Sequence, residues 1–182
     1  TVERLTGTVL PSETITVYVQ AYARPHASRL TGAAFITDYT YPDEIILRNT
    51  IHELFHPPVE WSDRGMKELI RTLRDVPSLV RAFDEHDPVY GYNYFQGYVE
   101  ENIVRMLEQL VAEPLGLGSG DPYARWRRED GGMHVLAPVL YSLAREHRLL
   151  ESGRSVSEFL TEYVTGRASE IEAMIGHGRP AD

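Results

Sequence analysis

Two histidines stand at a spacing that could bind a metal ion. Residues 52–56 read HELFH, and the surrounding sequence predicts a helix over residues 42–56. In a helix, residues four apart lie one turn above each other, roughly 6 Å along the axis, so His52 and His56 project from one face. Two imidazole nitrogens on one face can share a single zinc ion. This segment therefore predicts a Zn²⁺ site.

The glutamate that follows the first histidine has the position of a general base. A zinc ion lowers the pKa of the water in its open coordination position and polarises a scissile carbonyl. Glu53 can then take the proton of that water and later deliver it to a leaving amine. We expect a zinc-dependent hydrolase that acts on a peptide or protein substrate.

A catalytic zinc ion also needs a third protein ligand. The chain has no Cys, so this ligand must be His, Asp or Glu. The best candidates are Glu100 and Glu101, in the segment GYVEENIVRMLEQL. The apolar positions of this segment place Glu100 nearer to the buried face, but a ligand that faces a cleft need not lie on that face. Periodicity alone leaves the choice open.

The elements that must position these residues follow a simple order. Alternating apolar residues predict strands over about 13–39, and Pro42 with two following acids begins a helical part over about 42–175. This order predicts an α+β fold in a single domain spanning residues 1–182. The helices are expected at about 42–56, 61–86, 92–113, 121–149 with a break near Gly131-Gly132, and 155–175, before a flexible tail at 176–182.

The composition excludes some classes of binding partner. The formal net charge is -9 and the Lys and Arg residues are scattered, which argues against nucleic acid or an anionic membrane as the main partner. No segment has the roughly 20 apolar residues of a membrane span, so we expect a soluble chain. It begins at Thr1, which leaves open an upstream signal segment or domain; a removed signal segment would make the protein extracytoplasmic. Compartment and oligomeric state stay open.

The pattern resembles the gluzincin class of zinc metallopeptidases, in which H-E-x-x-H on one helix is completed by a Glu from a later helix. The separation between His56 and Glu101, about 45 residues, is typical of that class. In thermolysin-like and aminopeptidase-like members, apolar residues follow the ligand Glu by two and by about six positions. Ile103 and Leu107 match when the count starts at Glu101. The resemblance therefore implies that His52, His56 and Glu101 hold the zinc ion.

A narrower resemblance is to an uncharacterised family of bacterial proteins assigned as metallopeptidases, over roughly residues 45–165. The matching text is HELFHPPVEW and ENIVRML, with looser similarity in GGMHVLAPVLYSLAREH and SVSEFLTEYV. That family favours Tyr where this chain has His134, which implies an oxyanion-stabilising, catalytic role for His134. Tyr94 and Tyr98 are rival donors. Thermolysin-like enzymes have an Asp four residues after the ligand Glu, where this chain has Arg105. The way in which that Asp supports the metal site in those enzymes therefore cannot be carried over to this chain.

Substrate binding has an expectation of its own. In the class that the chain resembles, an edge strand beside the zinc helix receives an extended peptide through main-chain hydrogen bonds. The strand predicted at 30–37 has this place in the sequence, and the alternative is an ordinary inner strand. Two other functions stay open: a zinc-bound domain that binds a peptide or protein without cleaving it, and a hydrolase of non-peptide amides.

Overall fold

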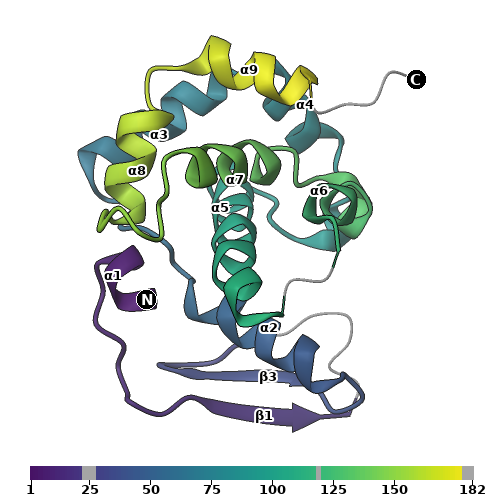
Figure 1. Ribbon diagram of the computed structural model, residues 1–182. Coiled ribbons are helices and arrows are strands. Elements are labelled where there is room, and N and C mark those ends of the chain that lie inside the picture. The colour runs from purple at the N-terminus through teal and green to yellow at the C-terminus, as the bar shows by residue number, and fades with distance from the viewer. Residues whose placement is uncertain (22–27, 118–119, 178–182) are drawn as a thin grey trace.

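The computed structural model describes residues 1–21, 28–117 and 120–177, and it confirms the α+β class (Figure 1). A small sheet lies at one end of the molecule, and helices form the rest. The elements in chain order are α1 (Val2–Thr6), β1 (Thr16–Gln20), β2 (Ser28–Arg29), β3 (Ala34–Asp38), α2 (Asp43–Leu54), α3 (Arg64–Arg74), α4 (Pro77–Glu85), η1 (Pro88–Tyr90), α5 (Phe95–Ala112), η2 (Glu113–Leu115), α6 (Pro122–Trp126), η3 (Glu129–Gly132), α7 (Ala137–Glu146), α8 (Val156–Tyr163) and α9 (Ala168–His177), where η marks a 3-10 helix.

The sheet has the strand order β1-β3-β2. β1 runs parallel to β3 along its whole length, from the pair Thr16 and Ala34 to the pair Gln20 and Asp38. β2 is antiparallel to β3 and pairs at Phe35 and Ile36. The expectation that the strand at 30–37 is an edge strand for a peptide is therefore wrong, because β3 is the central strand. β1 pairs with it along one side, and β2 pairs with Phe35 and Ile36 on the other.

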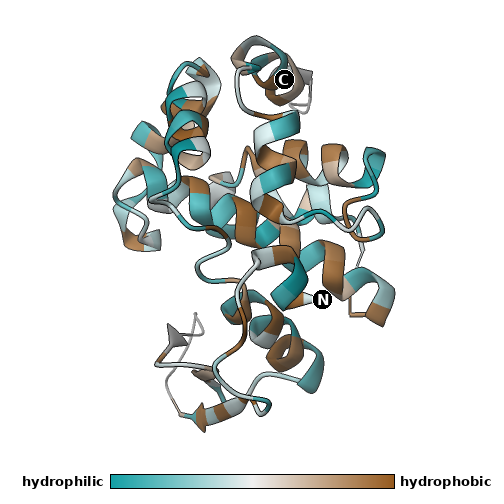
Figure 2. Ribbon diagram, turned by 90° about the vertical axis from the view of Figure 1, so that its left-hand side faces the viewer, coloured by the Kyte–Doolittle hydropathy of each residue, from teal (hydrophilic) through white to brown (hydrophobic). Residues whose placement is uncertain are grey.

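The helices form a succession of layers on this sheet. α2 packs on β3, α5 packs on α2, α7 packs on α5, and α9 packs on α7. α5 runs through the middle of the molecule (Figure 1), and most of its residues are buried. Figure 2 shows apolar residues in every layer of helices, interspersed with polar ones. The core therefore surrounds α5 rather than lying along one face of it.

α2 begins where the sequence predicts, but it ends at Leu54, two residues before the expected end at His56. Pro42 is the N-cap residue, and Asp43 and Glu44 occupy the first turn, where negative charge is favourable at the positive end of the helix dipole. The last helical residue is Leu54, and the following residues cannot continue the helix because Pro57 and Pro58 lack a backbone N–H. His52 lies in the last turn and His56 just beyond it.

Several helix boundaries differ from the expected ones. The helix expected at 61–86 is divided into α3 and α4 at Pro77, and the helix expected at 155–175 is divided into α8 and α9 around Gly166. Gly166 has φ +78°, a conformation that favours glycine. The tail expected from residue 176 begins inside α9, which extends to His177, and residues 178–182 lie outside the described residues.

A short helix before the strands was not expected. α1 has five residues, too few for a periodic pattern, and it is held by tertiary contacts. Leu5 is completely buried, and the Arg4 guanidinium donates to the Leu150 carbonyl at 2.8 Å and to the Arg154 carbonyl at 3.2 Å. α1 thus closes the core against α8.

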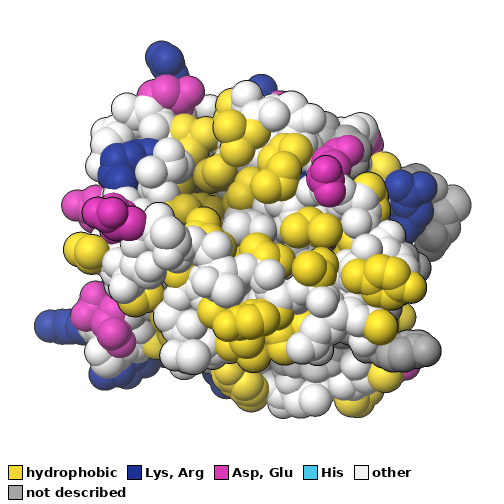
Figure 3. Space-filling model, turned by 90° about the horizontal axis from the view of Figure 1, so that it is seen from below, with side chains coloured by type: hydrophobic (Ala, Val, Ile, Leu, Met, Phe, Trp, Pro, Cys, Tyr) yellow, Lys and Arg dark blue, Asp and Glu magenta, His cyan; other side chains and the backbone are white. Residues whose placement is uncertain are grey.

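Apolar side chains are exposed on and around the sheet. They include Tyr18 and Val19 on β1, which are 49% and 55% exposed. The view from below in Figure 3 shows apolar side chains spread over this end of the molecule, with charged groups mostly at its margin. None of the helices in the described ranges has both the length and the apolar character that a membrane crossing requires.

Candidate metal centre

Three side chains bring one possible ligand atom each to a common point. The Nε2 atoms of His52 and His56 lie 3.2 Å apart, and Glu101 Oε2 lies 3.5 Å from each of them. In a tetrahedral zinc site with bonds of about 2.1 Å, neighbouring ligand atoms lie about 3.4 Å apart. The three separations therefore match those expected around one zinc-sized ion, and the group could hold a metal ion.

The polar atoms themselves also indicate a bound cation. Glu101 Oε2 is buried and has no hydrogen-bond partner among the described residues. A buried carboxylate oxygen without a partner is costly. The two facing Nε2 atoms cannot both direct a proton at each other. A cation among the three atoms would satisfy all of them, and two imidazoles with one carboxylate form the ligand set of a catalytic zinc site with an open position.

Each histidine is oriented by a carboxylate at its other ring nitrogen. His52 Nδ1 lies 3.2 Å from Glu108 Oε2, and His56 Nδ1 lies 3.1 Å from Glu100 Oε1. The Trp61 indole N–H donates to Glu100 Oε2 at 2.6 Å and so fixes that carboxylate as well. A carboxylate that accepts the Nδ1 proton leaves the Nε2 lone pair for a metal ion.

The structure thus separates the two adjacent glutamates that periodicity left open. Glu101 is completely buried and faces the histidines, whereas Glu100 orients His56 from the other side of its ring. Successive helical residues are rotated by about 100°, so neighbours on α5 can reach different sides of the same imidazole. Both glutamates belong to the site, with different places in it.

The second oxygen of Glu101 is engaged by an arginine. Arg105 lies one turn further along α5 and donates from Nε to Glu101 Oε1 at 2.7 Å. The same guanidinium donates to Asp130 Oδ2 at 3.1 Å, and His134 Nε2 lies 2.7 Å from that oxygen. Arg105 therefore holds Glu101 in place, at the position where thermolysin-like enzymes have an Asp.

A buried group of charged side chains surrounds Glu108. Glu108 Oε1 accepts from Arg48, at 3.1 Å from Nε and also from its terminal nitrogen, and from Arg125 at 3.1 Å. Two guanidinium groups thus face one carboxylate that is 4% exposed. This arrangement compensates the buried charge of Glu108 while its second oxygen orients His52.

The charges of the site shift the pKa values of its members. Burial alone would lower the pKa of His52, but the carboxylates of Glu101 and Glu108 outweigh it and raise the pKa to about 10. Burial would raise the pKa of Glu101, but the positive charges of His52 and Arg105 hold it well below the ordinary range. Without a metal ion, the site therefore holds an ionised carboxylate and attracts a proton to the histidines.

The three ligands line an open cleft of about 690 Å³. Glu53 lines the same cleft and is 8% exposed, so the expected general base lies beside the ligands. Three tyrosines also contribute to the wall: Tyr41, Tyr90 and Tyr92. The cleft joins a possible metal centre to groups that can transfer protons or donate hydrogen bonds.

Tyr92 stands out among these tyrosines. Its φ is +56°, in a region that residues with a Cβ rarely adopt and that costs about 1–3 kcal/mol. Burial raises the pKa of its hydroxyl, and the negative charges of Glu101 and Glu53 raise it further. The hydroxyl therefore keeps its proton and can donate a hydrogen bond next to the ligand atoms.

The three residues that the sequence suggested as hydrogen-bond donors to the oxyanion do not line the cleft. His134 is 1% exposed, pairs with Asp130 and lines a neighbouring cavity rather than the cleft. The Tyr98 hydroxyl donates to the Met133 carbonyl inside the core. Tyr94 is 63% exposed and lies over Gly97, outside the cleft. An oxyanion-stabilising role for His134 stays a prediction that this arrangement does not support.

Sequence reasoning missed Glu108, Arg48, Arg125 and the special position of Tyr92. Glu108 lies seven residues, about two helical turns, after Glu101, a spacing that places both on one face of α5 and could have indicated a second carboxylate near the histidines. The tyrosine-rich text YGYNYFQGY could have pointed to the cleft but not to one residue of it.

The structure therefore brings together His52, Glu53, His56 and Glu101, as the sequence predicted, and leaves His134 outside this group. Comparisons with protein-family models, with curated proteins and with solved structures find no match to this chain.

Proposed function

We propose that this protein is a zinc-dependent hydrolase, and specifically a metallopeptidase. The observation that carries the proposal is the convergence of His52 Nε2, His56 Nε2 and Glu101 Oε2 at separations of 3.2–3.5 Å, with Glu53 in the same cleft. This combination of ligands, an acid-base group and an open cleft is what hydrolysis by activated water requires.

A zinc ion, when bound, would supply Lewis-acid chemistry that lowers the pKa of a water molecule and polarises a carbonyl group. The residues of this chain supply the other roles. Glu53 removes the proton from the attacking water and returns it to the leaving amine. Tyr92 donates a hydrogen bond from its hydroxyl to the oxygen on which negative charge develops. Glu100 and Glu108 keep the histidines in the orientation that ligation needs.

A peptide is the substrate that the cleft and the H-E-x-x-H pattern favour. The cleft lies within the roughly 300–1,000 Å³ typical of ligand sites. Its wall carries polar tyrosine and asparagine side chains, for example Asn49, which can bind the amide groups of a main chain. Because β3 is an inner strand, the peptide would be held by these side chains and not by pairing with β3.

The first test is the metal content of the purified protein by elemental analysis. We expect about one zinc ion per chain in the wild type, none in His52→Ala or Glu101→Gln, and partial retention in Glu100→Gln. Glu101→Gln and Glu100→Gln form a matched pair, since they make the same change at adjacent positions. Equal retention by both variants, or no zinc in wild type after zinc is supplied, would contradict the proposed centre.

The second test separates a peptidase from a zinc-bound binding domain. Glu53→Gln should keep its zinc and lose cleavage of a peptide library by about 10²–10⁴-fold, the contribution of general acid–base catalysis. A wild type that binds zinc and cleaves no peptide in the library would contradict the assignment as a peptidase. If the wild type then hydrolyses non-peptide amides, the substrate class would be different, but the proposed metal centre would still hold.

A further inference from the structure

The turn that carries Tyr92 is tied to α4 by one histidine. His86 is the C-cap residue of α4. Its Nδ1 lies 2.5 Å from the carbonyl oxygen of Phe83, in the last turn of the helix, and its Nε2 lies 3.0 Å from the carbonyl oxygen of Gly91. Gly91 comes directly before Tyr92. The imidazole thus bridges the end of a helix and the residue next to a cleft tyrosine.

Both ring nitrogens of His86 must donate in this arrangement. A carbonyl oxygen only accepts hydrogen bonds, so each of the two contacts needs a proton on the nitrogen that faces it. A neutral imidazole has one such proton, and an imidazolium has two. The Phe83 ring stacks on the imidazole with 5.5 Å between centroids, and the face of an aromatic ring attracts a cation. The complete bridge therefore belongs to the charged form of His86.

The titratable and charged side chains around this imidazole have other partners or face the solvent. Arg81, Asp84 and Glu85 on α4 are exposed. The Asp87 carboxylate accepts from a backbone N–H of the following turn at 2.9 Å. The Tyr98 hydroxyl on α5 donates to a backbone carbonyl in the core. The two carbonyls are thus the partners toward which the ring directs its nitrogens.

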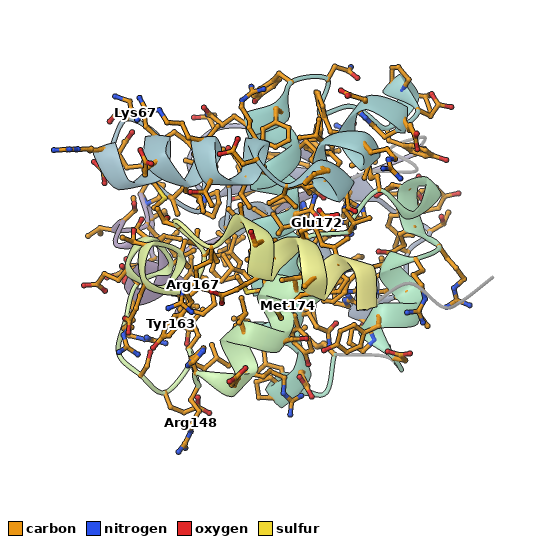
Figure 4. The ribbon with its side chains drawn as sticks, turned by 90° about the horizontal axis from the view of Figure 1, so that it is seen from above. Lys67, Arg148, Tyr163, Arg167, Glu172 and Met174 are labelled. Carbon is orange, nitrogen blue, oxygen red and sulfur yellow. The ribbon has the colours of Figure 1, made fainter. Side chains whose placement is uncertain are left out.

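α4 is a firm support for this bridge. At its start, Glu172 on α9 accepts from the Ser78 N–H at 2.9 Å and from the Ser78 hydroxyl at 2.6 Å. Figure 4 labels Glu172 on the side of α9 toward α4. Leu79, in the first turn of α4, is completely buried in the core. The bridge from His86 therefore begins on a helix that is itself anchored.

The conformation of Tyr92 needs such an anchor. Gly91 has φ +83° and ψ −159°, a region that is open essentially to glycine, and Tyr92 follows with φ +56°. The Gly91 carbonyl and the Tyr92 nitrogen belong to one planar peptide group. The φ of Tyr92 describes the rotation of that plane about the Tyr92 N–Cα bond. A hydrogen bond that fixes this carbonyl therefore holds Tyr92 in a conformation that its residue type rarely adopts.

We propose that His86 is a positioning residue, whose doubly protonated ring ties the Gly91 carbonyl to the end of α4 and so holds Tyr92 in the metal cleft. Loss of one proton breaks the bridge whichever nitrogen loses it, because one of the two carbonyls then has no donor. The position of Tyr92 is thereby made dependent on pH. The effect on turnover rests on the proposed hydrolysis, whereas the effect on position does not.

The first test follows the position of Tyr92 without any measure of activity. Tyrosine labelled with ¹³C in its ring gives NMR signals for each of the eleven Tyr residues, and Tyr92→Phe identifies those of Tyr92. His86→Phe identifies the ring signals of His86 in the same way. In wild-type protein supplied with zinc, we expect the Tyr92 signals to shift with rising pH at the same midpoint as the His86 ring.

Matched variants separate hydrogen bonding from packing. His86→Phe keeps a ring that can stack on Phe83 and loses both donors, so its Tyr92 signals should lack this shift and lie where those of the wild type lie at high pH. His147→Phe is the control, because His147 is also a half-buried C-cap residue and stacks on the Tyr163 ring at 3.7 Å. Figure 4 labels Tyr163 on α8, and neither residue of this pair lines the cleft. The control should keep the wild-type shift, and thermal unfolding checks that both variants fold.

The second test measures turnover on the proposed hydrolysis. His86→Phe should lower kcat for peptide cleavage by about 10²-fold, because displacement of a catalytic group by about 1 Å can cost that much, and KM should change little. In the Tyr92→Phe background the same substitution should have no further effect on kcat, because the group that His86 positions is gone. His147→Phe should leave kcat unaltered.

Each contrary result is distinct. Tyr92 signals that do not change across the titration of His86, or that are identical in wild type and His86→Phe, would overturn the proposal. Losses of kcat that multiply in the double variant would also overturn it, because His86 would then act on turnover without Tyr92. A wild type that cleaves no peptide would contradict the proposed hydrolysis, and the NMR signals alone would then decide the role of His86.

Discussion

Arg105 and Glu101 lie one turn apart on α5, and the arginine Nε donates to the glutamate Oε1 at 2.7 Å. This bond engages one carboxylate oxygen and leaves the other facing the two histidines. A freely rotating carboxylate would have to be ordered by the metal ion itself. Here the protein itself orders the carboxylate, without a metal ion, and buries a charged pair to do so.

Removal of this support should weaken metal binding. We expect Arg105→Gln to lower the zinc affinity about 10–100-fold, because partners of metal ligands contribute that much. The measurement is competition with a chromophoric chelator at fixed pH. Arg71→Gln is the matched control, since Arg71 also pairs with a glutamate on its own helix, Glu68, but at the surface. An Arg105→Gln variant that binds zinc as tightly as Arg71→Gln would contradict the role of Arg105.

Glu108 should matter for the stability of the whole fold. In Glu108→Leu, the buried guanidinium groups of Arg48 and Arg125 lose the carboxylate between them, and breaking such a pair costs about 3–5 kcal/mol in the free energy of unfolding. Urea unfolding of the metal-free proteins measures this change. Glu68→Leu, at an exposed pair, should change the free energy by less than about 0.5 kcal/mol. A similar small change for Glu108→Leu would be inconsistent with this account.

Metal binding should release protons at neutral pH. In the metal-free protein the pKa of His52 is raised to about 10, so a proton occupies this histidine at pH 7 and must leave when a metal ion binds. The zinc affinity should therefore rise with pH from neutrality toward about 10. Titration calorimetry in buffers of different ionisation enthalpy should give about one proton from the histidines per metal ion. No proton release at pH 7 would contradict the raised value.

The same shift has a consequence for folding without a metal ion. The pKa of His52 is higher in the folded chain than the ordinary 6.5, so folding binds an additional proton. The stabilisation from His52 is complete below pH 6.5 and disappears as the pH rises through about 10. Metal-free protein should accordingly unfold at lower urea concentration at pH 9.5 than at pH 6.5, with His52→Ala reducing the difference. A wild-type midpoint that does not fall between these pH values would show that this contribution is absent.

Tyr92 should affect turnover rather than metal content. On the proposed hydrolysis, Tyr92→Phe removes one donor to the developing oxyanion and should lower kcat about 10²–10³-fold with zinc retained. Tyr94→Phe makes the same change at an exposed tyrosine outside the cleft and should leave kcat unaltered. Equal kcat values for the two variants would show that Tyr92 does not stabilise the oxyanion. Another donor in the cleft would then have this role.

The part of the site that could be predicted from the sequence is the part that depends on one helix. His52 and Glu53 lie in the last turn of α2 and His56 follows two residues after its end, so their relation is local in the sequence. Glu101 comes from a helix far along the chain, and its identification depended on a resemblance because α5 is buried on nearly every side. Where all faces of a helix are covered, apolar periodicity cannot mark the face that meets the metal.

The remaining features depend on tertiary structure. Whether a strand is central or at an edge is decided by pairing, and β2, which makes β3 central, is only two residues long. Tyr92 has its position because of a backbone conformation that its residue type does not suggest. Arg48 and Glu108 look like ordinary helix charges in the sequence, and only the packing of α2 on α5 brings them together in the interior.

The central place of α5 has a consequence for genetic mapping of this protein. The helix contributes Glu100, Glu101, Arg105 and Glu108 to the site, and its buried neighbours Ile103 and Leu107 form the core around which the other helices pack. On the proposed hydrolysis, damaging substitutions at adjacent positions would abolish activity for two unrelated reasons, lost chemistry and lost folding. A library scored for activity alone would show one uninterrupted block of intolerance along α5. Only a parallel score for protein abundance would divide that block into its two interleaved sets of positions.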